Sequence, residues 1–422
     1  MEIIVQNRDI LIMLAIGFGL FMAWGIGAND VANAMGTSVG SGAITFKQAV
    51  IIAVIFEFAG AVLAGGEVTA TVRKGILDAG AFANNPELLV YGMLASLLAA
   101  ATWLLIASSL GWPVSTTHSI VGFGAVGVGI EAVSWDKVYA IIASWVVSPL
   151  IAGTMAIMIF KSLQRLVIDT EQPLENAKKY LPFYVFFVGF VLSLVTLLKG
   201  LKHVDSLKHL GKDLPTSMMI ATLVGILAAI IAAIIIRRIK TNPEDDNEFS
   251  YANMEKLFGG LMVITACSMA FAHGSNDVAN AIGPLAAVYS IVESGGQIVS
   301  KSALPSWILL VGGGGIVFGL ATFGFRVMKT IGKNITELTP SRGFSAELAA
   351  ATTVVFASYT GLPVSTTQVL VGAVLGVGIA RGVASLNLRV VNRIFLSWLI
   401  TLPAGAIMSI LFFFTLKGIF SA

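Results

Sequence analysis

Long apolar segments separated by short polar stretches recur along the whole chain. A run of about 20 predominantly apolar residues is long enough to cross the hydrocarbon core of a bilayer as a helix. The period-two alternation of β-barrel strands does not occur, so the pattern favours an all-α integral membrane protein. We predict about twelve transmembrane helices, centred near residues 20, 58, 98, 122, 150, 190, 228, 268, 317, 352, 374 and 408.

Two blocks of sequence each occur twice, in the same order. The stretch GIGANDVANAMG at 25–36 returns as AHGSNDVANAIG at 272–283, and GWPVSTTHSIVG at 111–122 returns as GLPVSTTQVLVG at 361–372. The copies lie about 250 residues apart in both cases, which indicates an internal duplication.

The duplication divides the chain into a first membrane repeat (1–165), a connecting segment with about two spans (166–252) and a second membrane repeat (253–422). About seven spans precede the second copy, and an odd number reverses its orientation. We therefore predict an inverted internal repeat, an architecture that recurs in secondary transporters with the binding site near the bilayer midplane.

Composition agrees with membrane insertion and narrows the function. Hydrophobic residues make up 56% of the chain and charged residues 12%, about half the roughly 25% charged residues of soluble proteins. The net charge of +3 does not indicate nucleic-acid binding, because Lys and Arg mark cytoplasmic loops in such proteins. The single cysteine, Cys267, excludes an intramolecular disulfide. We find no hydrolase or metalloprotease motif and predict that the protein is not an enzyme.

The first repeated block places a carboxylate inside an apolar run in each copy, at Asp30 and Asp277. A carboxylate at the bilayer centre costs about 2.5–3.5 kcal/mol on insertion scales, so it normally faces a cavity or a partner. Asparagines precede and follow each aspartate, and residues three or four apart share a helix face. These asparagines are Asn29, Asn33, Asn276 and Asn280. Such oxygen-rich patches suit a small hard cation or an oxyanion, although Asn and Asp also join helices in lipid.

The second repeated block places a proline before three hydroxyl residues. Proline is tolerated at a helix start, so Ser115 or Thr116 is predicted to cap the apolar helix that follows. A helix N-terminus carries unpaired N–H groups and a partial positive charge, and it binds anions. Two such termini could surround a tetrahedral oxyanion with donors, although plain helix capping stays open. The hydroxyl residues are Ser115, Thr116, Thr117, Ser365, Thr366 and Thr367.

The two blocks complement each other. Importing a dianion against an inside-negative potential costs about 4.6 kcal/mol per 100 mV, and inward movement of cations offsets that cost. Carboxylates beside an anion repel it unless a cation or proton lies between them, which favours Asp30 and Asp277 as cation ligands. Glu57, also in an apolar run, is either a further cation ligand or a structural hydrogen-bond partner.

The stretches GANDVANAMGTSVGSG at 27–42 and GSNDVANAIGP at 274–284, together with PVSTTHSIVG and PVSTTQVLVG, resemble the signatures of the inorganic phosphate transporter (PiT) family. The resemblance covers essentially the whole chain. It implies a sodium- or proton-coupled phosphate symporter with an inverted repeat that forms a homodimer. By position it points to Asp30, Asn33, Asp277, Asn280 and both Ser-Thr-Thr triplets as the site. The long hydrophilic loop of some eukaryotic members is missing, which suggests a compact prokaryotic form in the cell membrane.

We therefore predict a multi-pass, cation-coupled symporter that imports phosphate by alternating access through re-entrant or broken helices. Na⁺ is the favoured coupling ion and H⁺ stays open; no cofactor and no nucleic-acid partner is expected. The cation ligands are predicted to be Asn29, Asp30, Glu57, Asn276 and Asp277, and the phosphate ligands Asn33, Ser115, Thr116, Thr117, Asn280, Ser365, Thr366 and Thr367. The alternatives are transport of sulfate or another oxyanion, and an anion channel, which would not need two buried carboxylates.

Overall fold

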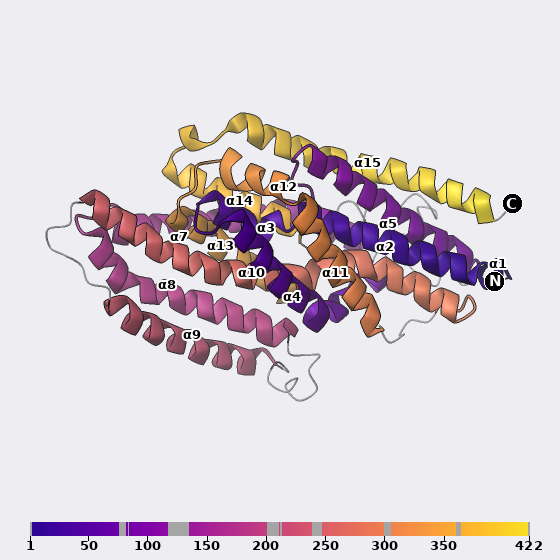
Figure 1. Ribbon diagram of the computed structural model, residues 1–422, viewed down its shortest axis with the longest axis horizontal. Coiled ribbons are helices and arrows are strands. Elements are labelled where there is room, and N and C mark those ends of the chain that lie inside the picture. The colour runs from indigo at the N-terminus through magenta and orange to yellow at the C-terminus, as the bar shows by residue number, and fades with distance from the viewer. Residues whose placement is uncertain are drawn as a thin grey trace.

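The structure, a computed structural model, describes residues 2–75, 82, 84–116, 135–200, 211, 213–238, 247–298, 305–359 and 364–420. Within these ranges all regular structure is helical, which confirms the predicted fold class. The long helices lie side by side, and both chain termini lie at the same end of the bundle (Figure 1).

The helices of the first 200 residues are α1 (Glu2–Gln6), α2 (Arg8–Asn29), α3 (Ala32–Gly40), α4 (Phe46–Gly75), α5 (Pro86–Ser109), α7 (Trp135–Leu163) and α8 (Pro173–Val195), with π-helical turns η3 (Gln164–Ile168) and η4 (Thr196–Gly200). The remainder comprises α9 (Leu214–Arg237), α10 (Asn247–Glu293), α11 (Ser306–Phe323), α12 (Phe325–Lys329), the π-helical turn η7 (Thr330–Asn334), α13 (Pro340–Tyr359), α14 (Thr366–Arg381), the 3₁₀ turn η8 (Val383–Ser385) and α15 (Leu388–Phe420).

The described part of the chain contains nine helical segments that are long and apolar enough to cross a membrane. Eleven of the twelve predicted centres fall on helices, and the centre near residue 122 lies outside the described residues. One of the eleven, α14, is a shorter apolar helix of 16 residues. The protein is thus a multi-pass membrane protein, while the count of twelve spans and the inverted repeat stay predictions.

The outer surface of the bundle is apolar, as the low charge content requires. Large hydrophobic side chains are exposed on most long helices, among them Leu223 (60%) and Leu399 (72%). Helices α8 and α9, from the connecting segment, pack against each other at one edge of the bundle (Figure 1). Exposed apolar side chains of this kind face lipid in a membrane protein, so the polar residues must gather inside.

Small residues let the two halves of the chain approach at backbone distance. A Cβ added at Gly27 on α2 would lie 1.8 Å from the Ile316 carbonyl oxygen on α11, and one at Gly274 on α10 would lie 2.2 Å from the Glu57 carbonyl oxygen on α4. Gly27 and Gly274 occupy the same place in the repeated block. Each copy of the block therefore packs, through its glycine, against a helix from the other half of the chain.

This close packing makes Gly274→Ala a destabilising substitution. The new methyl group would meet backbone atoms of α4, which cannot move aside as a flexible side chain can, and overpacking costs roughly 1–3 kcal/mol. Gly260→Ala on the same helix is the matched control, because no atom lies within 4 Å of its added Cβ. The half-buried Cys267 is the only cysteine, so its reaction with a thiol dye during heating reports unfolding. We expect a lower melting temperature for Gly274→Ala alone; equal temperatures for both variants would contradict the packing.

Candidate functional site

The first aspartate lies where the chain leaves one helix and enters another. Helix α2 ends at Asn29, Asp30 follows as its C-cap, and α3 begins at Ala32. Asp30 keeps one helical bond, from its N–H to the Ile26 carbonyl oxygen (2.7 Å), before the chain turns. Its side chain is only 1% exposed. The regular helix is thus interrupted at Asp30 and Val31, although both keep right-handed helical dihedrals, and the carboxylate lies deep inside the bundle.

The second aspartate lies on an unbroken helix. Asp277 belongs to α10, which stays helical from Asn247 to Glu293 even though it contains the same NDVANA sequence and Pro284. Asp277 is 3% exposed, and Asn280, one turn further on, is also buried. Asn276 is half-buried, and its Nδ2 donates to Asp277 Oδ1 at 2.8 Å. The two copies thus present their carboxylates from different backbone settings.

The hydroxyl triplet of the second copy forms the N-terminus of α14. Ser365 is the N-cap, and its Oγ accepts a hydrogen bond from the Gln368 backbone N–H at 3.3 Å, so the predicted cap is present in this copy. Thr366 and Thr367 form the first turn and are at most 4% exposed. In the first copy, Ser115 and Thr116 are buried, and Thr117 lies outside the described residues.

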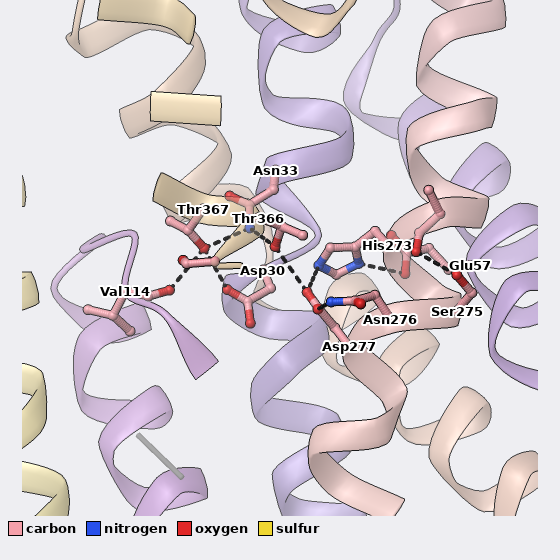
Figure 2. A network of polar contacts seen from close by, with 12 residues as sticks. Asp30, Asn33, Glu57, Val114, His273, Ser275, Asn276, Asp277, Thr366 and Thr367 are labelled. Atoms are coloured by element: carbon pink, nitrogen blue, oxygen red, sulfur yellow. Dashed lines mark hydrogen bonds and ion pairs between the residues drawn. The ribbon is translucent and has the colours of Figure 1, made fainter. Parts of the chain in front are cut away.

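The threonines of α14 connect the two aspartates (Figure 2). Thr366 Oγ1 donates to Asp277 Oδ2 and Thr367 Oγ1 is placed to donate to Asp30 Oδ1, each at 3.1 Å. Asn33 Nδ2 donates to Thr367 Oγ1 at 2.8 Å. Three of the four repeated segments therefore converge on one buried polar cluster, although the residues in contact lie 89 to 337 positions apart in sequence.

The fourth segment joins the same cluster through its backbone. Thr367 Oγ1 lies 3.1 Å from the Val114 carbonyl oxygen, which directly precedes Ser115. This loop is fixed by Asn29: its Nδ2 donates to the Trp112 carbonyl oxygen (3.0 Å), and its Oδ1 accepts from the Val114 N–H (3.1 Å). Trp398 Nε1 adds a bond to the Pro113 carbonyl oxygen at 2.9 Å. The Asn29 amide, whose Nδ2 also donates to Ser108 Oγ at 3.0 Å, therefore binds this loop and α5 in this conformation and makes no hydrogen bond to the aspartates among the described residues.

A histidine lies between two carboxylates beside the aspartate cluster. His273 Nδ1 is 2.9 Å from Glu57 Oε2, and its Nε2 is 2.7 Å from Asp277 Oδ2 (Figure 2). Both contacts are fully enclosed, since the three side chains are at most 4% exposed. Two ionised carboxylates can both accept from an imidazole only when the ring is doubly protonated. The Nδ1 contact has hydrogen-bond geometry, whereas Nε2 lies at ion-pair distance from Asp277 without that alignment. The arrangement therefore favours an imidazolium that balances part of the buried negative charge.

The cluster also contains acceptors without donors. Asp30 Oδ2 and Asn33 Oδ1 are buried and have no hydrogen-bond partner among the described residues. One ligand atom each from Asp30, His273 and Asp277 lies within 4.8 Å of the others. Buried oxygens that lack a donor are costly unless a cation or another donor satisfies them. Carboxylate and amide oxygens are hard ligands, which fit Na⁺ better than a softer transition metal.

Comparison with known proteins identifies the family. The profile of the phosphate transporter family matches residues 26–409, most of the chain. The chain belongs to this family. It is 53% identical to a putative phosphate permease of Haemophilus influenzae, with all of both chains covered. It is 44% identical to the chloroplastic inorganic phosphate transporter 2-1 of Arabidopsis thaliana, with 94% of this chain and 70% of that protein covered.

A solved structure of a sodium-dependent phosphate transporter has the same fold. The TM-score is 0.84 at 40% identity, and the match covers 96% of this chain and 99% of the other. The family consists of transporters, so this chain is a membrane transporter and not an enzyme. The family resemblance carried by the two repeated blocks is thereby confirmed.

Two buried groups of this family member were not predicted from its sequence. His273 has no counterpart in the first copy, where Ile26 occupies the equivalent position, so the duplication of polar residues does not single it out. Its position four residues before Asp277, inside an apolar run, was the available signal. Glu347 is fully buried on α13 and accepts hydrogen bonds from Thr37 (2.5 Å), Ser38 (2.6 Å) and Thr265. It too lies alone in an apolar stretch, where an ionisable residue is a functional candidate.

Proposed function

We propose that this family member imports inorganic phosphate together with Na⁺ by alternating access. One observation supports the proposal above all: two buried aspartates and the hydroxyl-bearing N-terminus of α14 share a single buried cluster. The carboxylates suit cations, and the helix terminus suits an oxyanion. The sodium-dependent phosphate transporter of the same fold supports Na⁺ as the coupling ion.

The cation is proposed to bind between the two aspartates. Asp30 Oδ2 and Asn33 Oδ1, the acceptors without donors, supply two of its oxygens, and Asp277 supplies a third. Glu57 acts through His273, since its Oε2 contacts the ring and not the other carboxylates. Asn276 orients Asp277, and Asn29 holds the loop before Ser115. We thus propose positioning roles for Glu57, Asn276 and Asn29 in place of direct cation binding.

Phosphate is proposed to bind at the N-terminus of α14 and the matching segment of the first copy. With cations on the aspartates, Thr366 and Thr367 are free to turn their hydroxyl protons from the carboxylates toward an oxyanion. Ser365 precedes them in sequence, Ser115 and Thr116 are the corresponding residues of the first copy, and all three are buried. Thr117, which corresponds to Thr367, and Asn280, which corresponds to Asn33, complete the proposed set of phosphate ligands. A bound cation reduces the electrostatic repulsion between the aspartates and the anion. Binding of the two ligands is therefore coupled, and so is their transport.

The two-repeat organisation gives the proposal its moving parts. We propose that the first repeat (1–165) and the second repeat (253–422) are inverted copies that together form two bundles, and that one bundle rocks against the other with α8 and α9 of the connecting segment at the periphery. The cross-packing of α2 with α11 and of α10 with α4 makes each repeat contribute to both halves of the bundle. We also propose that the protein functions as a homodimer in a prokaryotic cell membrane.

Uptake into proteoliposomes tests this function. Purified protein is reconstituted, and uptake of radiolabelled phosphate is measured with an inward Na⁺ gradient, an inward H⁺ gradient or neither. We expect uptake above the level of protein-free liposomes with the Na⁺ gradient, and only weak inhibition by excess sulfate. Equal uptake with no gradient would indicate a channel, and equal competition by sulfate would indicate a general oxyanion transporter.

A further inference from the structure

A short loop connects the surface of the bundle with the buried cluster. After α5 ends, the chain passes from Leu110, which is 56% exposed, to Val114, which is fully buried in the cluster, within four residues (Figure 2). We call residues 109–114 the α5 loop. Its inner end leads directly into Ser115 and Thr116, two of the proposed phosphate ligands.

The α5 loop begins with a regular helix end that leaves its carbonyl groups open. Gly111 has φ +69°, and its N–H donates to the Ser108 carbonyl oxygen at 3.1 Å. The Trp112 N–H donates to the Ala107 carbonyl oxygen at 2.9 Å. This Schellman pattern satisfies the N–H groups, so the carbonyl oxygens of the loop need donors from elsewhere.

The inner half of the α5 loop is held by helices that also pack against α5. Asn29, at the end of α2, donates to the Trp112 carbonyl oxygen at 3.0 Å. Trp398, on α15, donates to the Pro113 carbonyl oxygen at 2.9 Å. Both α2 and α15 pack along α5. The inner half of the loop therefore belongs to the same packed group as the helix from which it starts.

The outer half of the α5 loop is held by a different group of elements. Arg326 on α12 donates from Nη1 to the Ser109 carbonyl oxygen at 2.9 Å. Thr330, the first residue of η7, donates from Oγ1 to the Gly111 carbonyl oxygen at 2.8 Å. Both α12 and η7 pack chiefly against α3, and a Cβ added at Gly332 would lie 2.1 Å from a backbone oxygen of α3. Two hydrogen bonds thus join the α3 group to the loop.

We propose that Arg326 and Thr330 form a latch that holds the α5 loop closed over the buried site, and that release of the latch opens the site to water at this end of the bundle. The inference rests on the proposed function, because alternating access requires a barrier that opens and closes. The donors and the acceptors belong to separately packed groups, so a rocking movement can break both bonds without breaking a helix.

The position of the latch makes its release inexpensive. Arg326 is exposed and Thr330 is half-buried, so water can replace the partners that each loses. Hydrogen bonds near the surface are the first to open in local movements, whereas buried ones persist. The latch also lies at a π-helical turn, a feature that recurs at functional sites inside helices.

Covalent closure tests whether the latch must open during transport. A Cβ added at Gly111 would lie 3.3 Å from Thr330 Oγ1, so cysteines at both positions are within reach of a disulfide. In a Cys267→Ala background, we expect oxidation of the Gly111→Cys/Thr330→Cys pair to abolish phosphate uptake and dithiothreitol to restore it. Each single variant is a control and should not respond to the oxidant. Full uptake by the cross-linked protein would show that the contact persists through the cycle and would overturn the proposal.

Accessibility of the inner end of the loop measures the latch without transport. The reporter is Val114→Cys in the same background, and the probe is a charged thiosulfonate reagent that reacts only in water. Thr330→Val removes one neutral hydrogen bond of about 1–1.5 kcal/mol from the closed state, so labelling should become roughly 5- to 13-fold faster. Thr222→Val on α9, where the hydroxyl donates within its own helix, is the matched control and should label at the unmodified rate.

Thr330→Ser separates the hydrogen bond from packing, because it keeps the hydroxyl group and loses only the methyl group. It should label at the unmodified rate. Unchanged labelling in Thr330→Val would overturn the proposal even if the cysteine pair at the latch failed to fold. Equal acceleration in Thr330→Val and Thr330→Ser would also overturn it, because the effect would then come from the methyl group.

Uptake and labelling together separate this inference from the proposed function. A chain whose labelling follows the latch variants but that carries no phosphate with an inward Na⁺ gradient would overturn the proposed function and leave the latch standing. A chain that carries phosphate, yet labels equally in all latch variants, would overturn the latch alone.

Discussion

Asp30→Asn is expected to reduce Na⁺-driven phosphate uptake by roughly 30-fold to several-thousand-fold, the factor that corresponds to about 2–5 kcal/mol for truncating one member of a buried charge pair. The substitution keeps an acceptor for Thr367 and changes the volume little. It removes the negative charge that offsets the desolvation of a bound cation. Uptake should therefore fail while the fold persists.

The control for this substitution is Asp9→Asn, the same chemical change at an exposed position in the first turn of α2. Asp9→Asn should transport phosphate at the unmodified rate. Melting temperatures of both variants, read through Cys267, establish that loss of uptake in Asp30→Asn is not loss of folding. Full Na⁺-dependent uptake by Asp30→Asn would remove Asp30 from the cation site.

His273→Gln is expected to lower the stability of the protein by about 3–5 kcal/mol, the usual cost of removing one partner of a buried ion pair. The ring separates Glu57 from Asp277 and contacts both. Without it, two buried carboxylates face each other with no cation between them, so each loses its partner and repels the other. The melting temperature should fall at low Na⁺ concentration.

A double substitution identifies the cause of that loss. Glu57→Gln combined with His273→Gln removes one of the two carboxylates, so part of the lost stability should return. The two changes should thus be strongly non-additive, because the residues share contacts. Additive losses in melting temperature would show that His273 stabilises the fold by packing alone, and that its contacts with the two carboxylates contribute little.

Much of the fold and part of the site follow from local sequence. Runs of apolar residues identify transmembrane helices because the bilayer requires each segment to satisfy its own backbone hydrogen bonds. Duplicated polar residues inside such runs identify the cluster, because a polar side chain in lipid needs a partner. These two arguments lead to Asp30, Asp277, Thr366 and Thr367, which the structure brings together.

The remainder depends on tertiary contacts that no local pattern encodes. The sequence NDVANA occurs in both copies, yet the helix breaks at Asp30 and continues through Asp277, so the difference must come from what packs around each copy. Asn29 and Asn276 are equivalent in sequence, but one binds the loop before Ser115 and the other binds Asp277. The partner of His273, Glu57, is 216 residues away on another helix.

The most direct test of a shared site is the affinity for phosphate measured at rising Na⁺ concentration on purified protein, with choline keeping the ionic strength constant. If the aspartates and the α14 terminus bind cation and anion side by side, each ligand must strengthen binding of the other by the same factor. We predict that the dissociation constant for phosphate falls steadily as Na⁺ increases. A dissociation constant that is independent of Na⁺ would contradict the account.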